Sequence, residues 1–273
     1  MTRRFVSRTL MYLILIVAAA FFLLPIYLML LTGFKPFAEV DLKTMWNLPS
    51  SLQIDNFIRA WGQLAPNMKN SLILVIPESI LSSLLGSLNG YLLSKWRFKH
   101  SNLIFSLILF GMFIPYQSIL IPLVKFMDFI HLYGGLPGLV LVDVIYGIPI
   151  TTLIFRNYYA GISTEVLEAG RIDGASLMGL YRHIILPLSG PSFAVVIIWQ
   201  FTQAWNDFLF AVILTNQAYW PVTVALNNLA GSQLVQWNVL MAATLLAALP
   251  TLLVYLFLGR YFVRGLMAGS LKG

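Results

Sequence analysis

Long apolar runs, separated by shorter polar stretches, dominate this chain. Each run is close to the ~20 residues that a helix needs to cross a bilayer. The first run follows Arg3, Arg4 and Arg8, and it is longer than the ~7–15-residue apolar core of a signal peptide, so we interpret it as a retained span. The pattern predicts six membrane-spanning helices, at about residues 10–34, 70–93, 103–124, 136–155, 192–215 and 238–258.

The composition supports a membrane protein. Of the 273 residues, 59% are hydrophobic and 10% are charged, and the mean hydropathy is +0.83. A soluble domain carries about 25% charged residues, so one water-soluble core would not hide this much apolar surface. We predict an all-α, polytopic membrane protein with a single transmembrane domain over residues 1–273. The chain has no cysteine, which excludes disulfides and thiolate chemistry.

The distribution of Lys and Arg predicts the orientation. Six spans put both termini on one side, and positively charged loops stay on the cytoplasmic side. With the termini inside, twelve of the 17 Lys and Arg residues lie in inner segments and five in outer ones. We therefore expect cytoplasmic termini and a cytoplasmic loop at 156–191. The basic residues form no stripe, so the net charge of +7 indicates contact with anionic lipid headgroups and no nucleic-acid partner.

Two spans carry signals about packing and breaks. Ser82, Gly86 and Gly90 recur every fourth residue in the second span, and this spacing allows another helix to approach closely. Pro115 and Pro122 lie in the third span, where proline removes a hydrogen bond and clashes with the preceding turn. We expect the third span to be broken at both prolines.

The stretch Thr164–Pro187 is the longest polar interruption in the second half of the chain. We expect a first helix over about Thr164–Asp173, ended by Gly174 in a left-handed cap. Ser176 should cap a second helix, and Pro187 should end it. From shape alone, an amphipathic loop on the membrane surface fits this stretch better than a docking element for a soluble partner.

The residues at fixed spacing in this stretch favour the docking element. Glu168-Ala169-Gly170, followed at set intervals by Gly174, Ile184 and Leu186-Pro187, resembles the EAA motif of the permeases of binding-protein-dependent ABC importers. Six of the seven motif positions match, and the departure is Gly170, where the family usually has a second Ala. Asp173-Gly174-Ala175 also matches the extended form of the motif.

Three carboxylates, Glu78, Asp143 and Asp207, lie within predicted spans. Charges at membrane depth are costly and usually face a cavity or a partner, so these groups either line a polar pathway or hold helices together through hydrogen bonds. Gln203 and Asn206 share a helical face with Asp207 in the fifth span. Together with the flanking rings of Trp205 and Phe208, this face suits a sugar, which is polar at its edges and apolar on its faces.

Two further segments resemble known permeases. Trp205-Asn206-Asp207-Phe208 resembles a recurrent segment of sugar-type ABC permeases, and Tyr261–Gly273 resembles the tail of the maltose-type carbohydrate permeases. The resemblance implies a transmembrane subunit of an ATP-driven importer for a sugar or oligosaccharide, in a bacterial or archaeal cytoplasmic membrane. It also implies a set of residues that couple the loop to an ATPase, namely Glu168, Ala169, Gly170, Asp173, Gly174, Ala175 and Leu177.

The same resemblance implies several partners. They are a second homologous permease, two ATPase subunits and an extracytoplasmic substrate-binding protein. The chain has no Walker A pattern, and the dipeptide Gly-Lys does not occur in it. We therefore expect no enzyme activity, no catalytic or metal site and no cofactor on this chain, with ATP and Mg²⁺ bound by the partner ATPase. The alternative is an ion- or proton-coupled secondary transporter that uses Glu78, Asp143 and Asp207.

Overall fold

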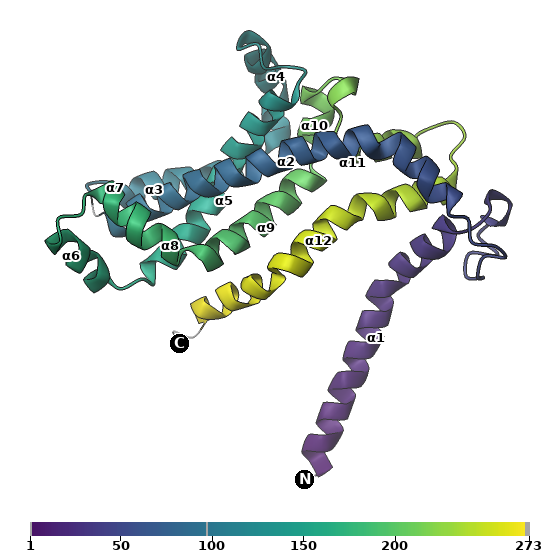
Figure 1. Ribbon diagram of the computed structural model, residues 1–273, viewed down its shortest axis with the longest axis horizontal. Helices are drawn as coiled ribbons and strands as arrows, with labels where there is room; N and C mark the ends of the chain where they lie inside the picture. The colour runs from purple at the N-terminus through teal and green to yellow at the C-terminus, as the bar shows by residue number, and fades with distance from the viewer. Residues whose placement is uncertain (1, 97, 271–273) are drawn as a thin grey trace. The chain divides into compact units, whose positions relative to one another are not determined.

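The structure is a computed structural model that describes residues 2–96 and 98–270, with side chains described for residues 7–96 and 98–261. Within these ranges the secondary structure is helical, apart from one isolated bridge between Gly134 and Thr215. The all-α prediction is therefore confirmed for the described residues. The elements, drawn in Figure 1, are α1 (Thr2–Gly33), η1 (Phe37–Glu39), α2 (Asp55–Lys95), α3 (Ser101–Phe110), η2 (Gly111–Phe113), η3 (Tyr116–Ile119), α4 (Leu120–Phe129), α5 (Leu136–Ala160), α6 (Thr164–Ile172), α7 (Leu177–Leu180), η4 (Tyr181–Ile185), α8 (Leu186–Leu188), α9 (Gly190–Asn206), α10 (Leu209–Leu214), η5 (Gln217–Tyr219), α11 (Val222–Ala230) and α12 (Trp237–Ser270).

The described part of the chain divides into two compact units. The first unit comprises the residues up to Pro66 together with Ala225–Leu249. The second comprises Asn67–Val224 and the residues from Pro250 onward. Because α2, α11 and α12 each contribute to both units, the units are connected by continuous helices. The single transmembrane domain over residues 1–273 stays a prediction.

Several helices are long and apolar enough to cross a membrane. Among the described residues there are four such helices, and two bent helix pairs raise the number to six if each pair counts as one span. The four helices are Ser7–Gly33, Asp55–Lys95, Leu136–Ala160 and Trp237–Tyr261. The bent pairs are Ser101–Phe113 with Tyr116–Phe129, at 86°, and Leu177–Leu188 with Gly190–Asn206, at 77°.

The predicted third span, 103–124, is not one continuous helix, as its prolines indicated. The chain turns by 86° between Phe113 and Tyr116, at Pro115, so the break predicted there is confirmed. Pro122 makes no break, because it lies in the first turn of α4. A helix tolerates proline in its first turn, where the missing N–H has no intrahelical partner.

The predicted fifth span, 192–215, is likewise not one continuous helix. Helix α9 ends at Asn206, and α10 begins only at Leu209. At the break, the Asp207 carboxylate accepts hydrogen bonds from the backbone N–H groups of Phe210, at 3.4 Å, and Ala211, at 2.9 Å. These are N–H groups that the start of a helix leaves without an intrahelical acceptor, so Asp207 stabilises the start of α10.

Two helices extend well beyond the predicted spans. Helix α2 has 41 residues and begins at Asp55 rather than near residue 70. At ~1.5 Å per residue, it is about twice as long as the ~30 Å hydrocarbon core of a bilayer. Helix α12 continues past residue 258 to Ser270. The side chains of the predicted C-terminal tail after Tyr261 lie outside the described residues.

The small residues of α2 bring it against α5 within the second unit. A Cβ added at Gly86 would lie 2.2 Å from Oγ1 of Thr151, and one at Gly90 would lie 2.7 Å from the backbone N of Arg156. No side chain fits at these distances. The close approach predicted from the spacing of Ser82, Gly86 and Gly90 is confirmed, and α5 is the helix that approaches.

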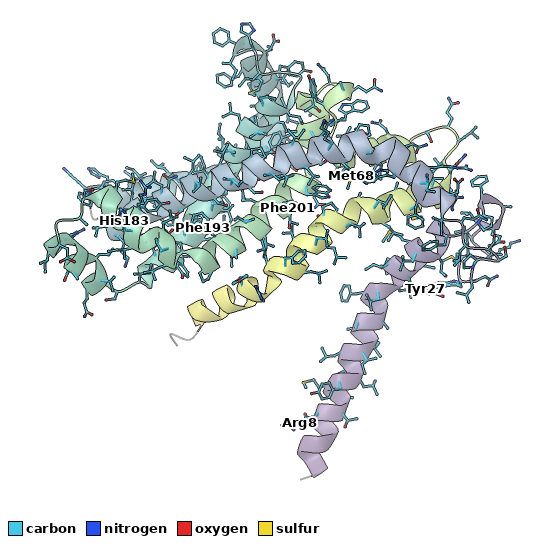
Figure 2. All side chains as sticks on the ribbon, in the orientation of Figure 1. Arg8, Tyr27, Met68, His183, Phe193 and Phe201 are labelled. Carbon is cyan, nitrogen blue, oxygen red and sulfur yellow. The ribbon has the colours of Figure 1, made fainter. Side chains whose placement is uncertain are left out.

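Helix α1 is apolar around its whole circumference, and its side chains project outward (Figure 2). Phe21 is 72% exposed and Phe22 is 75% exposed. None of its most apolar 18-residue window is buried inside the protein. A helix that is hydrophobic on all sides needs an apolar surrounding, so this surface is suited to lipid or to another membrane-spanning chain.

Candidate functional site

The polar stretch at 164–187 contains the turn at Gly174 and the cap at Ser176 that the sequence predicts, and Ser163 provides a further cap that was not predicted. Ser163 Oγ accepts a hydrogen bond from the N–H of Glu165, at 3.2 Å, at the start of α6. Gly174 has a φ of +81°, in the left-handed region that favours glycine, directly after the end of α6. Ser176 Oγ then accepts from the N–H of Gly179, at 3.2 Å, and caps α7.

The predicted end of the second helix is off by one residue. The helical run through α7, η4 and α8 includes Pro187 and ends at Leu188. Pro187 lies at the start of the short helix α8, where its missing N–H costs little. The bend of 77° therefore falls between Leu188 and Gly190, at Ser189.

Helix α6 has a buried face and an exposed face. Leu167 is 4% exposed, and a Cβ added at Gly170 would lie 2.7 Å from Cδ2 of Leu180 and 2.8 Å from Cδ1 of Ile184. Gly170 therefore makes room for the second helix of the same loop. On the opposite side, Ile172 is 87% exposed, and the exposed residues also include Val166, Glu168, Ala169 and Asp173.

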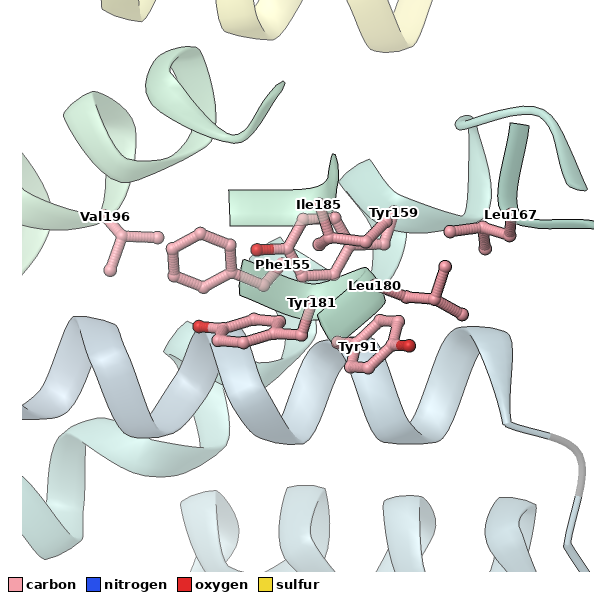
Figure 3. Packing of buried hydrophobic residues seen from close by; sticks show 8 residues of the cluster. All are labelled: Tyr91, Phe155, Tyr159, Leu167, Leu180, Tyr181, Ile185 and Val196. Carbon is pink, nitrogen blue, oxygen red and sulfur yellow. The ribbon is translucent and has the colours of Figure 1, made fainter. Parts of the chain in front are cut away.

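The loop is anchored to the ends of α2 and α5 by an apolar cluster, shown in Figure 3. The cluster comprises Tyr91, Phe155, Tyr159, Leu167, Leu180, Tyr181, Ile185 and Val196, and Ala175 and Leu177 pack against it. Two side chains of α2 also hold the loop backbone. Tyr91 Oη donates to the carbonyl oxygen of Leu177 at 3.1 Å, and Lys95 Nζ donates to that of Ile162 at 2.6 Å.

The residues that the sequence offered for a polar pathway lie together. Glu78, Asp143, Gln203, Asn206 and Asp207 all line one cavity of about 530 Å³ in the second unit. The first and last of them are 129 positions apart in the sequence, so their common position at one cavity could not be predicted from spacing. The flanking ring of Phe208 lines the cavity too. Trp205 instead is 4% exposed and stacks on Phe201, with 5.6 Å between ring centroids.

Several other residues line the cavity that the sequence pattern did not indicate. The rings of Tyr116, Tyr146, Trp199 and Phe210 surround the cavity, and Gln200 contributes an amide. Gln200 is a polar residue in an apolar run, so its position carried a signal. The rings carried none, because an aromatic residue in a membrane span usually packs against lipid or another helix.

The three carboxylates have different surroundings. Glu78 is 1% exposed, and its Oε1 accepts a hydrogen bond from Nε2 of Gln200 at 2.8 Å. The same Nε2 donates to Ser82 Oγ at 2.7 Å. Asp207 caps α10. Asp143 is 8% exposed, and its Oδ2 is buried with no hydrogen-bond partner in the described part of the chain. Asp143 therefore lines the cavity with one buried acceptor oxygen that has no hydrogen-bond partner among the described residues.

The helix arrangement and this loop define a multi-pass membrane permease, and comparison with known proteins agrees. Residues 82–267 match the family described as binding-protein-dependent transport system inner membrane component. The chain is 45% identical to a probable ABC transporter permease protein of Pyrococcus horikoshii, over 98% of each chain. It is 35% identical to the xylose/arabinose import permease protein XacI of Haloferax volcanii, over 95% of this chain and 92% of the relative.

A solved structure has the same fold. A chain of a bacterial ABC transporter, described as involved in the import of the acidic polysaccharide alginate, superimposes with a TM-score of 0.82 at 21% identity, covering 94% of this chain and 96% of that one. The protein whose structure is described here belongs to the family of binding-protein-dependent transport system inner membrane components. It is an ABC importer permease, as its resemblance to the EAA-motif permeases implied, and in this family the ATPase is a separate subunit.

Proposed function

We propose that this permease takes up a sugar or oligosaccharide and that its 164–187 loop couples the membrane-spanning helices to a cytoplasmic ATPase. The observation that carries the proposal is the two-faced helix α6. Its inner face is fixed to its own protein through Leu167 and Gly170, while Ile172 stays 87% exposed. A large apolar side chain held in this way is costly to leave in water, so it suits a groove on a partner protein.

The coupling residues divide into two groups by their surroundings. Glu168, Ala169 and Asp173 are exposed and would contact the ATPase directly. Gly170, Gly174, Ala175 and Leu177 would act indirectly, because they set the angle between α6 and α7 and the packing of the loop. In this mechanism, closure of the ATPases on ATP and Mg²⁺ moves the loop, and the loop moves the helices that line the cavity.

The cavity has the chemistry of a sugar pathway. Aromatic rings can stack on the apolar faces of a sugar, while Asp143, Gln203 and Asn206 can hydrogen-bond to its hydroxyl groups. Among the described residues, three carboxyl groups and no Lys or Arg line the cavity. An acidic sugar would therefore find no basic partner in this lining, so we propose an uncharged solute. A xylose/arabinose import permease among the relatives supports this class of solute.

The remaining parts of the proposal follow from the importer class. The chain would form half of the translocation pathway, with a second homologous permease forming the other half. Two ATPase subunits would lie on the cytoplasmic side, with the termini and the 156–191 loop. An extracytoplasmic binding protein would deliver the solute, and the complex would reside in the bacterial or archaeal cytoplasmic membrane. The family match favours this mechanism over an ion-coupled secondary transporter.

Site-directed crosslinking in native membranes tests the coupling. Met178 in α7 is 55% exposed, whereas Leu177 packs on the apolar cluster, so Met178→Cys is the better probe. The chain has no other cysteine that would react. We expect an adduct with a chain that carries a Walker A sequence, in a yield that changes with ATP. The control is Leu234→Cys, at an 89% exposed position in a loop that the charge distribution puts outside, and it should give no such adduct.

An accessible Met178→Cys thiol that forms no adduct with an ATPase, with or without ATP, would contradict the coupling role.

A further inference from the structure

Four buried hydroxyl groups form a continuous chain where α2, α5, η4 and the start of α9 meet. Ser87 Oγ lies 2.6 Å from Tyr159 Oη and 2.9 Å from Tyr181 Oη. Tyr159 Oη lies 2.9 Å from Ser189 Oγ, which donates to the carbonyl oxygen of Ile185. Ser87, Tyr159 and Ser189 are fully buried, and Tyr181 is 9% exposed.

The direction of every hydrogen bond in this chain follows from proton counting. Each hydroxyl carries one proton. Ser189 gives its proton to Ile185, so it must accept from Tyr159. Tyr159 must then accept from Ser87, and Ser87 from Tyr181. The hydrogen bonds therefore run in one direction, from Tyr181 to the carbonyl of Ile185, and removal of one hydroxyl leaves a neighbour without its partner.

The two ends of the hydroxyl chain coincide with the two ends of a π-helix. The helix η4, Tyr181–Ile185, is wider than an α-helix, and such turns are rare and often lie at functional sites. The hydroxyl chain leaves η4 at its first residue, passes through α2 and α5, and returns to its last residue. In Figure 3, Tyr159, Tyr181 and Phe155 lie close together in the apolar cluster.

The hydroxyl chain also braces a corner. The run Leu177–Leu188 meets α9 at 77°, and Ser189 stands at this corner. A Cβ added at its neighbour Gly190 would meet nothing within 4 Å, so no side-chain contact at Gly190 fixes the angle. The hydrogen bond between Tyr159 Oη and Ser189 Oγ holds Ser189 against α5. Beyond the corner, α9 carries Trp199, Gln200 and Gln203, which line the cavity.

We propose that this hydroxyl chain is the rigid link that transmits movement of the loop to the cavity, with Ser87, Tyr159, Tyr181 and Ser189 as positioning residues. With the corner braced, a displacement of α6 and α7 rotates α9 and α5 as one body. Without these hydrogen bonds, the same displacement bends the polypeptide at Ser189, and the helices that line the cavity do not move. Buried networks of this kind act as units, so one hydroxyl fewer weakens the whole link. The inference rests on the proposed coupling role of the loop.

Two reporters, measured in the purified complex with its own partner chains, distinguish the rigid link from the coupling role of the loop. The first is the crosslink of Met178→Cys to the ATPase. The second is the rate at which a maleimide labels Gln203→Cys in the cavity, and neither reporter requires knowledge of the solute. In the unaltered background, ATP should change both, and the labelling rate should change about fivefold or more, the lower end of usual coupling between sites.

The test variant is Ser87→Ala, and its matched control is Ser83→Ala. Both serines lie on α2, one turn apart, and are at most 1% exposed, but Ser83 Oγ has no hydrogen-bond partner in the described structure. In Ser87→Ala, ATP should still change the crosslink while its effect on Gln203→Cys labelling is largely lost. Ser83→Ala should keep both responses. Tyr159→Phe, which retains the ring, should behave like Ser87→Ala and provides a second variant.

A full response of Gln203→Cys to ATP in Ser87→Ala and Tyr159→Phe would overturn the rigid link while leaving the coupling loop intact. Equal loss of that response in Ser83→Ala would also overturn it, because any buried hydroxyl would then matter. Failure of the crosslink reporter in the unaltered background would instead count against the coupling role itself.

Discussion

The side-chain amide of Gln200 on α9 donates to the carboxylate of Glu78 on α2, with 2.8 Å between Nε2 and Oε1. The two residues are 122 positions apart in the sequence, and both are at most 3% exposed. The same nitrogen donates to Ser82 Oγ, one turn further along α2. The two helices that form this wall of the cavity, α2 and α9, are therefore joined by a hydrogen bond between two residues that line it.

Replacement of Gln200 should weaken this wall. Among the described residues, the carboxylate of Glu78 in Gln200→Leu keeps only the hydroxyl of its neighbour Ser79 as a donor. A buried acceptor without its partner costs about 1–3 kcal/mol, so the melting temperature of the purified protein should fall. The control Gln217→Leu, at an exposed position, should melt like the unaltered protein. An unchanged melting temperature in Gln200→Leu would mean that the contact contributes no net stability.

Asp143→Asn should have the opposite effect on stability. Asp143 is 8% exposed, and its Oδ2 has no hydrogen-bond partner in the described structure, so an ionised carboxylate at this position would cost folding free energy. Asn cannot ionise and avoids that cost, so the protein should be more stable by about 1–3 kcal/mol, seen as a higher melting temperature. Uptake should fall at the same time, because the solute loses an acceptor. The exposed Asp128→Asn should change neither quantity, and a lower melting temperature in Asp143→Asn would contradict the account.

Gly86→Ala and Gly62→Ala form a matched pair on α2. A Cβ at Gly86 meets Thr151 of α5 at 2.2 Å, whereas a Cβ at Gly62 meets nothing within 4 Å. Overpacking typically costs about 1–3 kcal/mol, while Ala in an open helix position gains about 0.5–1 kcal/mol over Gly. Thermal melting should therefore fall for Gly86→Ala and rise slightly for Gly62→Ala. Similar shifts for both variants would mean that α2 and α5 do not pack as described.

Gly174→Trp should uncouple ATP hydrolysis from uptake while the protein remains inserted in the membrane. Gly174 has a φ of +81°, which costs other residues about 1–2 kcal/mol, so a bulky side chain there shifts the angle between α6 and α7. The measurement is solute uptake per ATP hydrolysed in reconstituted vesicles. Gly62→Trp serves as the control for a bulky residue at an open position. Uptake at the unaltered rate in Gly174→Trp would rule out a coupling role for this turn.

The features that the sequence predicted well depend on neighbouring residues. The length of an apolar run decides whether a helix can cross a bilayer, and the helices at 136–155 and 238–258 were recognised on that basis. The left-handed turn at Gly174 and the cap at Ser176 follow from backbone sterics and from a hydroxyl within reach of free N–H groups. The motif that begins at Glu168 led to the family in the same way.

Features that join distant segments required the tertiary structure. In the sequence the three carboxylates are far apart. Only the fold brings them to one cavity, leaves Oδ2 of Asp143 without a hydrogen-bond partner in the described structure and uses Asp207 to start α10. The fold likewise turns Gly170 toward Leu180 and joins Ser87, Tyr159, Tyr181 and Ser189 in one chain of hydroxyl groups.

By itself, therefore, the sequence determined an all-helical membrane permease with a recognisable polar loop, because run lengths, caps and motif spacing are local properties. The tertiary structure alone decided which polar groups meet and which of them line the cavity. The reason is physical: a hydrogen bond requires two groups within about 3 Å, and for residues more than a hundred positions apart that distance is set by how the helices pack.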